Sequence, residues 1–296
     1  MAVFDSSAKA LTCQRGVRLL LEAEVKLHQL TTKTTVKSSR QPKVLTSEQV
    51  RAYDDEGYLI LRNVFTQDKV ALLGEEGDRI AREHSDLIDQ KNLRVRFNPH
   101  VVNGAPVFEV FDPIADLSSL ADEVAHDPHL FKILHDIYGE PAELFKEKLI
   151  YKQAGAIGAT LHQDWIGWPS FPESFLTVLV AIDSFTHESG ATEVYPGLHK
   201  NGYLSPKDGQ HHLLSADAMG AKPVPLLLEP GDIAIFGCFT PHRSAANTSP
   251  VSRRGYFISY NASSDGGDQY KKHYSEFHDW IRAKSPAEIR DQLFFR

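Results

Sequence analysis

The order of helical and strand-like segments is the feature that most limits the fold of this 296-residue chain. Helical patterns come first, with a capped start at Thr46-Ser-Glu-Gln, a second start at Thr66 and a further helical region over residues 118–138. Short apolar or alternating runs follow, separated by Gly, Pro, Asn and Ser, at residues 144–153, 175–185, 191–195, 223–228, 232–236 and 255–260. This order predicts a mainly β protein with helices (α+β), in which a β-sandwich or jelly roll carries helices on one side.

Two further regions are expected to have a different secondary structure from the β-rich part of the chain. Residues 85–116 hold turn signals at Asn98-Pro, Asn103-Gly and Asp112-Pro, so we predict irregular structure there. Residues 272–296 return to a helical pattern. Because no internal repeat or low-complexity tract interrupts it, the stretch 45–296 is interpreted as one domain.

The first 44 residues have a different charge from the rest of the chain. They contain eight Lys or Arg and three acidic residues, whereas the whole chain has a net charge of −7. A basic segment is typical of an organelle-targeting sequence, but Asp5, Glu22 and Glu24 argue against one. We expect residues 1–44 to be a basic, flexible extension of a cytoplasmic protein. An organellar location follows if they act as a targeting segment.

Composition excludes several classes of protein. No run approaches 18 consecutive apolar residues, so we expect no membrane span. The net negative charge makes nucleic acid an unexpected partner. Two cysteines, Cys13 and Cys238, form no disulfide framework and indicate a reducing compartment. The expected partner is a small-molecule substrate, with the chain acting as a monomer or a homo-oligomer.

The motif His162-Gln-Asp164 carries the clearest chemical signal. Side chains two residues apart on an extended chain point the same way and can hold one metal ion between them. His242, at the far end of a later strand, is the best third ligand. Two His and one carboxylate are the ligand set of non-haem Fe(II) oxygenases, which leave three positions open. The alternative is that His162 caps a loop and Asp164 is a solvated turn residue.

A second group follows His242. Arg253 comes eleven residues later, after an Asn247-Thr-Ser-Pro turn, so we expect the two strands to form a hairpin that places Arg253 beside the metal. Its guanidinium could grip a carboxylate with two hydrogen bonds, and Ser244, on the same face as His242, could donate another. The alternative for Arg253 is a surface ion pair. Because Arg254 is adjacent, one of the two arginines should face away.

These residues resemble the phytanoyl-CoA dioxygenase-like family of Fe(II)/2-oxoglutarate oxygenases, which includes the ectoine hydroxylases. The resemblance covers most of residues 45–262, from Asp55-Glu-Gly-Tyr through Tyr151-Lys-Gln-Ala-Gly and His162-Gln-Asp to Gly231-Asp-Ile, His242-Arg-Ser and Arg253. It implies a double-stranded β-helix (jelly-roll, cupin-like) core with N-terminal and C-terminal helices packed on one sheet. It also implies Fe(II) on His162, Asp164 and His242, and 2-oxoglutarate on Arg253 and Ser244.

The resemblance extends to the reaction. It implies that the chain is an enzyme that uses Fe(II), 2-oxoglutarate and O2, releases succinate and CO2, and hydroxylates a substrate C–H bond. Relatives that halogenate lack the carboxylate of Asp164, so its presence favours hydroxylation. By likeness to ectoine hydroxylases, Lys148 contacts 2-oxoglutarate, Lys146 lies near both ligands and Trp168 lines the substrate site.

The substrate is indicated by one alternating strand. In residues 145–153, Lys146, Lys148, Ile150 and Lys152 share one face. If that face lines the barrel, it favours a small anionic or zwitterionic substrate such as an aminoalkylphosphonate, because a bulky apolar substrate would leave the charges unpaired. The alternative is an edge strand with its lysines in water. Two other functions stay open: a hydroxylase of an acyl thioester or natural-product scaffold, and a non-catalytic cupin-like binding protein.

Overall fold

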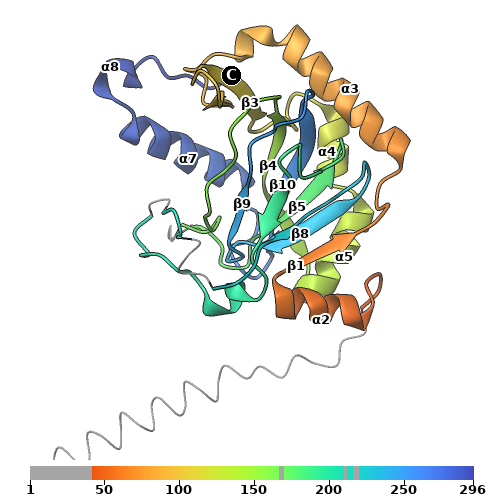
Figure 1. Cartoon of the computed structure of the whole chain (residues 1–296). Helices are drawn as coiled ribbons and strands as arrows, with labels where there is room; N and C mark the ends of the chain where they lie inside the picture. The colour runs from red at the N-terminus through yellow and green to blue at the C-terminus, as the bar shows by residue number, and fades with distance from the viewer. Residues whose placement is uncertain (1–41, 167–169, 210–211, 216–219) are drawn as a thin grey trace, which may run out of the picture. The chain divides into compact units, whose positions relative to one another are not determined.

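Two antiparallel sheets form the core of the chain (Figure 1). The computed structural model describes residues 42–166, 170–209, 212–215 and 220–296, so Trp168 and residues 1–41 lie outside the described residues. The larger sheet contains, in spatial order, β1 (Tyr58–Leu61), β8 (Ile233–Gly237), β5 (Leu176–Ala181), β10 (Arg253–Ala262), β4 (Ala142–Lys152), β3 (Pro106–Phe111) and β2 (Val95–Pro99). The smaller sheet contains β7 (Val224–Pro225), β6 (Thr192–Val194) and β9 (His242–Ser244). The predicted jelly roll is therefore confirmed.

Strand β5 shows how the layers are held together. Val178 and Val180 belong to the core cluster shared with the helices, whereas Leu179 and Ala181 belong to the cluster between the two sheets. Successive side chains of a strand point to opposite faces, so one fully buried strand contributes to both clusters. Phe236 and Phe257 of the cluster between the sheets also line the pocket of the candidate site.

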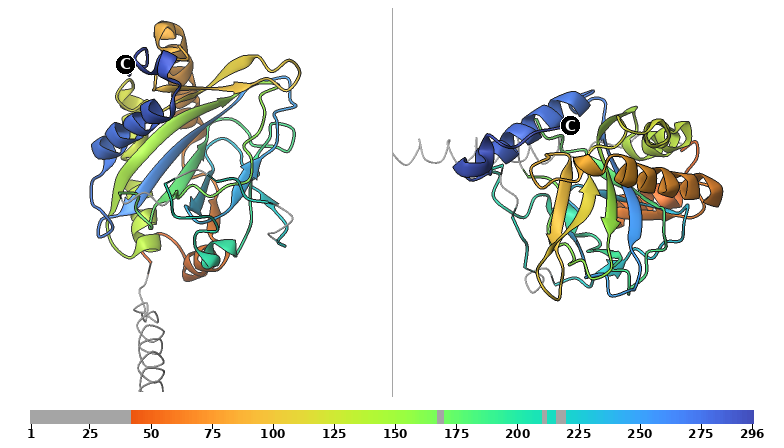
Figure 2. Two further views of the ribbon diagram at one scale, coloured as in Figure 1. Left: turned by 90° about the vertical axis from the view of Figure 1, so that its left-hand side faces the viewer. Right: turned by 90° about the horizontal axis from the view of Figure 1, so that it is seen from above.

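Helices cover the outer face of the larger sheet, as Figure 2 shows. They are α2 (Ser47–Glu56), α3 (Gln67–Glu83), α4 (Ser119–Ala125), α5 (Pro128–Tyr138) and α7 (Tyr270–Lys284). The short helix α8 (Ala287–Arg290) follows α7 and has no buried residue. Helix α2 begins where the sequence predicted, because Thr46 and Gln49 form a reciprocal capping box. Asp136 of α5 accepts the backbone N–H groups of residues 43–45, which ties the start of the described chain to the helical layer.

Residues 85–116 depart from the prediction of irregular structure. They contain the short 3-10 helix Ser85–Leu87 and the antiparallel hairpin β2–β3, which forms one edge of the larger sheet. Polar residues such as Asn98 and Glu109 obscure the alternation of these strands, and pairing with β4 supplies their stability instead. A register shift at Arg96/Phe97 marks a β-bulge opposite Glu109.

The helical pattern predicted over residues 272–296 is found in α7 and α8, which Pro286 separates because it lacks a backbone N–H. One prediction about the chain path is wrong. Strands β9 and β10 do not form a hairpin, since β9 pairs with β6 and β10 pairs with β4 and β5. The connection crosses between the sheets, and buried Asn247 fixes it by donating to the carbonyl oxygens of Lys152 and Val251.

Candidate metal centre

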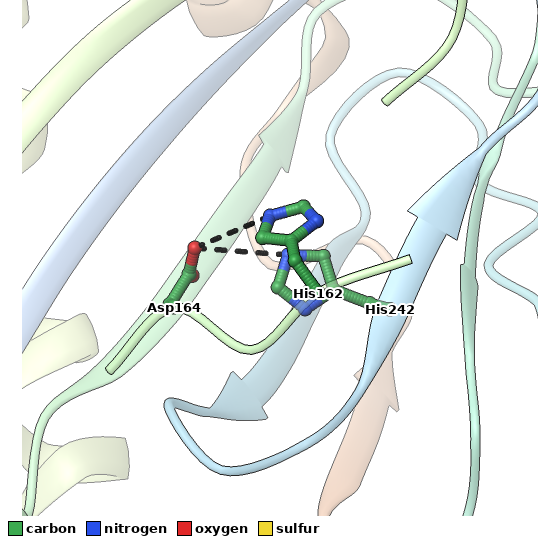
Figure 3. A group of neighbouring side chains, drawn as sticks. All are labelled: His162, Asp164 and His242. Carbon is green, nitrogen blue, oxygen red and sulfur yellow. Dashed lines mark ion pairs between the residues drawn. The ribbon is translucent and has the colours of Figure 1, made fainter. Parts of the chain in front are cut away.

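His162, Asp164 and His242 meet at one point beside the small sheet (Figure 3). His162 and His242 exchange both backbone hydrogen bonds, at 3.0 and 2.9 Å, so their side chains lie on the same face. Oδ1 of Asp164 is 3.7 Å from Nε2 of His162 and 3.8 Å from Nε2 of His242. The structure thus brings together the three ligands expected from sequence, each offering one atom toward a common centre.

The second nitrogen of each imidazole is held by the backbone. Nδ1 of His162 lies 2.6 Å from the carbonyl oxygen of Thr160, and Nδ1 of His242 lies 3.0 Å from that of Thr240. A carbonyl can only accept, so each Nδ1 carries the proton and each Nε2 keeps its lone pair for a metal. Burial also lowers the pKa of His242 to about 4, which keeps its ring neutral.

The carboxylate of Asp164 stays ionised in this setting. Burial alone would raise its pKa, but His242, His162, Lys146 and Lys148 together hold the pKa well below its usual range. Two imidazoles and one ionised carboxylate are the donor set that Fe(II) takes in non-haem oxygenases. The residues therefore fit the metal that the sequence led us to expect.

Arg253 is buried on β10 and faces the interior. Its Nη2 donates to the carbonyl oxygen of Gly190 at 3.0 Å, and its guanidinium lies 3.9 Å from the ring centroid of Phe185. Its Nε is buried and has no hydrogen-bond partner among the residues that the structure describes. Burial lowers the pKa of Arg253 to about 10. A buried guanidinium with unused donors is suited to bind a carboxylate in the pocket. Arg254 faces the other side of the sheet and pairs with Asp183 and Asp78.

The lysine face of β4 points inward. Strand β4 is an interior strand, paired with β10 and β3, so the edge-strand alternative is wrong. Lys148 lines the pocket and lies 5.8 Å from the ring centroid of Phe257. Lys146 lies 5.4 Å from the ring centroid of Phe175, and burial together with Lys148 lowers its pKa. Neither ammonium has a hydrogen-bond or ion-pair partner within the described part of the chain.

The pocket beside the metal group has a volume of about 180 Å³. Ser244 lines it, and its Oγ accepts hydrogen bonds from Nζ of Lys152 at 2.8 Å and from the backbone N–H of Ala159 at 3.0 Å. Arg253 and Lys148 also line this pocket, so most residues that the sequence selected surround one space. Trp168 lies outside the described residues.

Two polar residues of the pocket were not selected from the sequence. Glu109 of β3 and Asn98 of β2 both line the pocket and are hydrogen-bonded to each other. Burial raises the pKa of Glu109, and the charges of Lys152, Arg253 and Lys148 oppose that shift. The available signal was an acidic residue inside the apolar run 107–111. Such a residue is rarely buried without a functional or pairing role.

Comparison with known proteins agrees with this geometry. A family model described as phytanoyl-CoA dioxygenase (PhyH) matches residues 53–255. The chain is 36% identical over 141 residues to a methylphosphonate hydroxylase of Gimesia maris and 34% identical over 161 residues to a 2-aminoethylphosphonate dioxygenase of an uncultured bacterium. These matches cover 47% and 54% of this chain, and they span only 53% and 59% of the two relatives.

Solved structures show the same fold. The structure of EctD from S. alaskensis with 2-oxoglutarate and 5-hydroxyectoine aligns with a TM-score of 0.63 at 19% identity, covering 78% of this chain and 82% of that one. The epimerase SnoN with Fe3+ and alpha ketoglutarate aligns with a TM-score of 0.61, also at 19% identity, covering 73% and 83%. Within the described part of the chain, no helix has the length and apolar character needed to cross a bilayer.

Proposed function

Because the chain belongs to the phytanoyl-CoA dioxygenase (PhyH) family, we propose that it is an Fe(II)- and 2-oxoglutarate-dependent dioxygenase. Its proposed reaction hydroxylates a C–H bond of a small anionic or zwitterionic substrate and releases succinate and CO2. An alkylphosphonate or aminoalkylphosphonate is the leading substrate class. The observation that carries the proposal is the meeting of His162, Asp164 and His242 beside Lys148, which lines the same pocket and has no hydrogen-bond partner among the described residues.

The three ligand side chains would hold Fe(II), and Arg253 would bind the distal carboxylate of 2-oxoglutarate. Ser244 would donate a further hydrogen bond to that carboxylate, and Lys148 would lie along the same molecule. When bound, Fe(II) supplies the dioxygen chemistry that couples oxidation of 2-oxoglutarate to hydroxylation. The protein's own contribution is to orient both molecules and exclude water, for which Phe236 and Phe257 provide apolar walls.

The charges around the pocket support an anionic substrate. Asp164, Glu109, Lys148, Lys152, Arg243 and Arg253 line the pocket, and Arg243 is paired with Glu193. Lys146 does not line the pocket but interacts by charge with Asp164. Without the paired Arg243, Lys148, Lys152, Arg253 and the nearby Lys146 exceed the two carboxylates by two positive charges. Fe(II) and the 2-oxoglutarate dianion cancel each other, so an excess of two positive charges remains. A buried charge is costly unless it is paired, and a phosphonate would supply the missing negative charge.

Lys146 is the proposed anchor for that anion. Its ammonium lies over the rings of Phe171 and Phe175, at 5.8 and 5.4 Å from their centroids, and interacts with Asp164 by charge. It is therefore placed on the metal side of β4, away from the Arg253 end. The two phosphonate-acting relatives support the same class of substrate.

The experiment has two stages. The full chain is first loaded with Fe(II) without oxygen and titrated with 2-oxoglutarate by calorimetry; the Asp164→Ala variant, which should lose metal, is the control. Succinate release in air is then measured with methylphosphonate, 2-aminoethylphosphonate, ectoine, betaine and an acyl thioester. We expect one of the phosphonates to stimulate release at least tenfold.

Each alternative has its own outcome. Stimulation by the acyl thioester alone would favour the second enzyme function, although about 180 Å³ is small for such a substrate. Absence of 2-oxoglutarate binding by the wild-type chain would favour a non-catalytic cupin-like protein. A Lys146→Met variant separates anchoring from general damage, because only the KM for the phosphonate should rise while the KM for 2-oxoglutarate stays the same.

A further inference from the structure

Lys152, the last residue of β4, is a buried lysine with no role in the proposed reaction so far. The residue is 2% exposed, and its Nζ donates to three protein oxygens. These are the carbonyl oxygen of Gly190 at 3.1 Å, Oγ of Ser244 at 2.8 Å and the carbonyl oxygen of Ala245. An ammonium has three N–H donors, so Lys152 has none left for a ligand. It differs in this respect from Lys146 and Lys148.

The bonds of Lys152 determine what the hydroxyl of Ser244 can do. A hydroxyl has two lone pairs and one hydrogen. The lone pairs of Ser244 are taken by Lys152 and by the backbone N–H of Ala159. The hydrogen must therefore be donated elsewhere, and Ser244 lines the pocket. Lys152 thus makes Ser244 a donor directed at the pocket, as a carboxylate requires.

The same lysine also shares an acceptor with Arg253. Both side chains donate to the carbonyl oxygen of Gly190, at 3.1 and 3.0 Å. Gly190 has φ +64, and a Cβ at this position would lie 2.4 Å from the carbonyl oxygen of Ala245 and 2.8 Å from Nζ of Lys152. Only glycine allows the backbone to come this close, which fixes the carbonyl that orients the guanidinium.

We propose that Lys152 is a positioning residue for the distal carboxylate of 2-oxoglutarate, acting through Ser244 and Arg253 without touching the co-substrate. This inference rests on the proposed function. Lys152 joins the end of β4, the loop at Gly190 and strand β9, which come from both sheets. A preformed site of this kind lowers the ordering cost of binding.

A double-mutant cycle tests the inference by measuring anaerobic binding of 2-oxoglutarate to the Fe(II)-loaded full chain. We expect Ser244→Ala and Lys152→Met each to weaken binding about tenfold, since each loses a hydrogen bond to a charged group. The double variant should bind no more weakly than Lys152→Met alone, because Lys152 acts through Ser244. The matched control is Lys148→Met. Its fold loss of 2-oxoglutarate binding and that of Ser244→Ala should multiply when the two substitutions are combined.

Steady-state kinetics gives a second readout, in which Lys152→Met raises the KM for 2-oxoglutarate more than it lowers kcat. If Lys152→Met shows no cooperative thermal transition, Lys152→Arg replaces it in the cycle, and its loss of 2-oxoglutarate binding should be smaller in the Ser244→Ala background than in the wild-type background. The inference would be overturned if the losses of 2-oxoglutarate binding caused by the Lys152 variant and by Ser244→Ala multiplied in the double variant. It would also be overturned if a folded Lys152 variant bound 2-oxoglutarate as tightly as the wild type. Absence of 2-oxoglutarate binding by the wild-type chain would instead overturn the proposed function.

Discussion

Lys152 and Arg253 are directly paired across the β4–β10 ladder, and both side chains turn into the same interior. Two adjacent buried cations repel each other and are costly to desolvate. Accordingly, burial and the neighbouring charge of Arg253 lower the pKa of Lys152 to about 7. A dianionic ligand would relieve this cost, which explains why the pair lies in a pocket.

The neighbouring arginines 253 and 254 provide a matched test of that pocket. Arg253→Met should raise the KM for 2-oxoglutarate about 100-fold, because a bidentate charge-assisted contact is lost. Arg254→Met should leave that KM unchanged and lower the melting temperature, since Arg254 is bound to Asp183 and Asp78 on the helix side. Equal KM values for the two variants would contradict the assignment of Arg253.

Glu109 opposes the binding of an anion. Its carboxylate interacts with Lys152, Arg253 and Lys148, so it cancels part of the positive charge of the pocket. Glu109→Gln keeps the shape of the side chain and should tighten anaerobic 2-oxoglutarate binding a few-fold at neutral pH. Calorimetric titration of the two proteins provides the measurement. Weaker binding by the variant would mean that Glu109 instead holds the cations in place.

Gly158 permits the close packing of two segments of the site. A Cβ at this residue would lie 1.7 Å from the carbonyl oxygen of Ser244, so Gly158→Ala must displace β9. We expect a loss of about 2 kcal/mol or more in the free energy of unfolding and weaker metal binding. Gly237→Ala is the control, because its Cβ would lie 3.3 Å from Oη of Tyr53 and 3.7 Å from Oγ1 of Thr240, which is far less crowded. Denaturant titration compares the two, and equal losses would refute the expectation.

His273 should make the protein sensitive to acid. Burial lowers its pKa to about 3, so the folded state excludes a proton that the unfolded state binds below about pH 6.5. Its contribution to stability is complete above pH 6.5 and declines as the pH falls toward 3. His273→Phe removes this acid-induced loss of stability, because phenylalanine binds no proton. Its ring can pack against the neighbouring rings of Phe145 and Phe277.

The variant should therefore gain about 2 kcal/mol in unfolding free energy relative to wild type when the pH is lowered from 7.5 to 5. Chemical denaturation at the two pH values measures the difference. His129→Phe, at an exposed position, is the control and should keep the wild-type pH dependence. An identical pH dependence for His273→Phe and wild type would rule out this role.

Local spacing made the metal group predictable from sequence. His162 and Asp164 are two residues apart, and their common orientation follows from an extended backbone alone. Arg253 lines the pocket beside the three candidate ligands, but it reaches that place by a different route from the one expected. The eleven residues after His242 do not form a hairpin, and Arg253 reaches the pocket because its strand belongs to the opposite sheet.

The remaining polar residues depend on pairing between distant strands. Glu109 lies at a β-bulge between β2 and β3, where the strict alternation of side chains fails. Lys152 could be assigned to the lysine face of β4, but its three acceptors lie about 40 to 90 residues away in the chain. Such contacts arise from tertiary packing, which periodicity within one segment does not encode.

The origin of the site residues has a consequence for how the pocket can change. The metal group comes from β9 and the segment that pairs with it, whereas the inward lysines come from β4 of the opposite sheet. The candidate metal ligands and the proposed substrate anchor Lys146 thus lie on opposite sheets, whereas Arg253, proposed for 2-oxoglutarate, shares the larger sheet with Lys146. Under the proposed function, selectivity can be redesigned at Lys146 while the segments that carry His162, Asp164 and His242 stay unchanged.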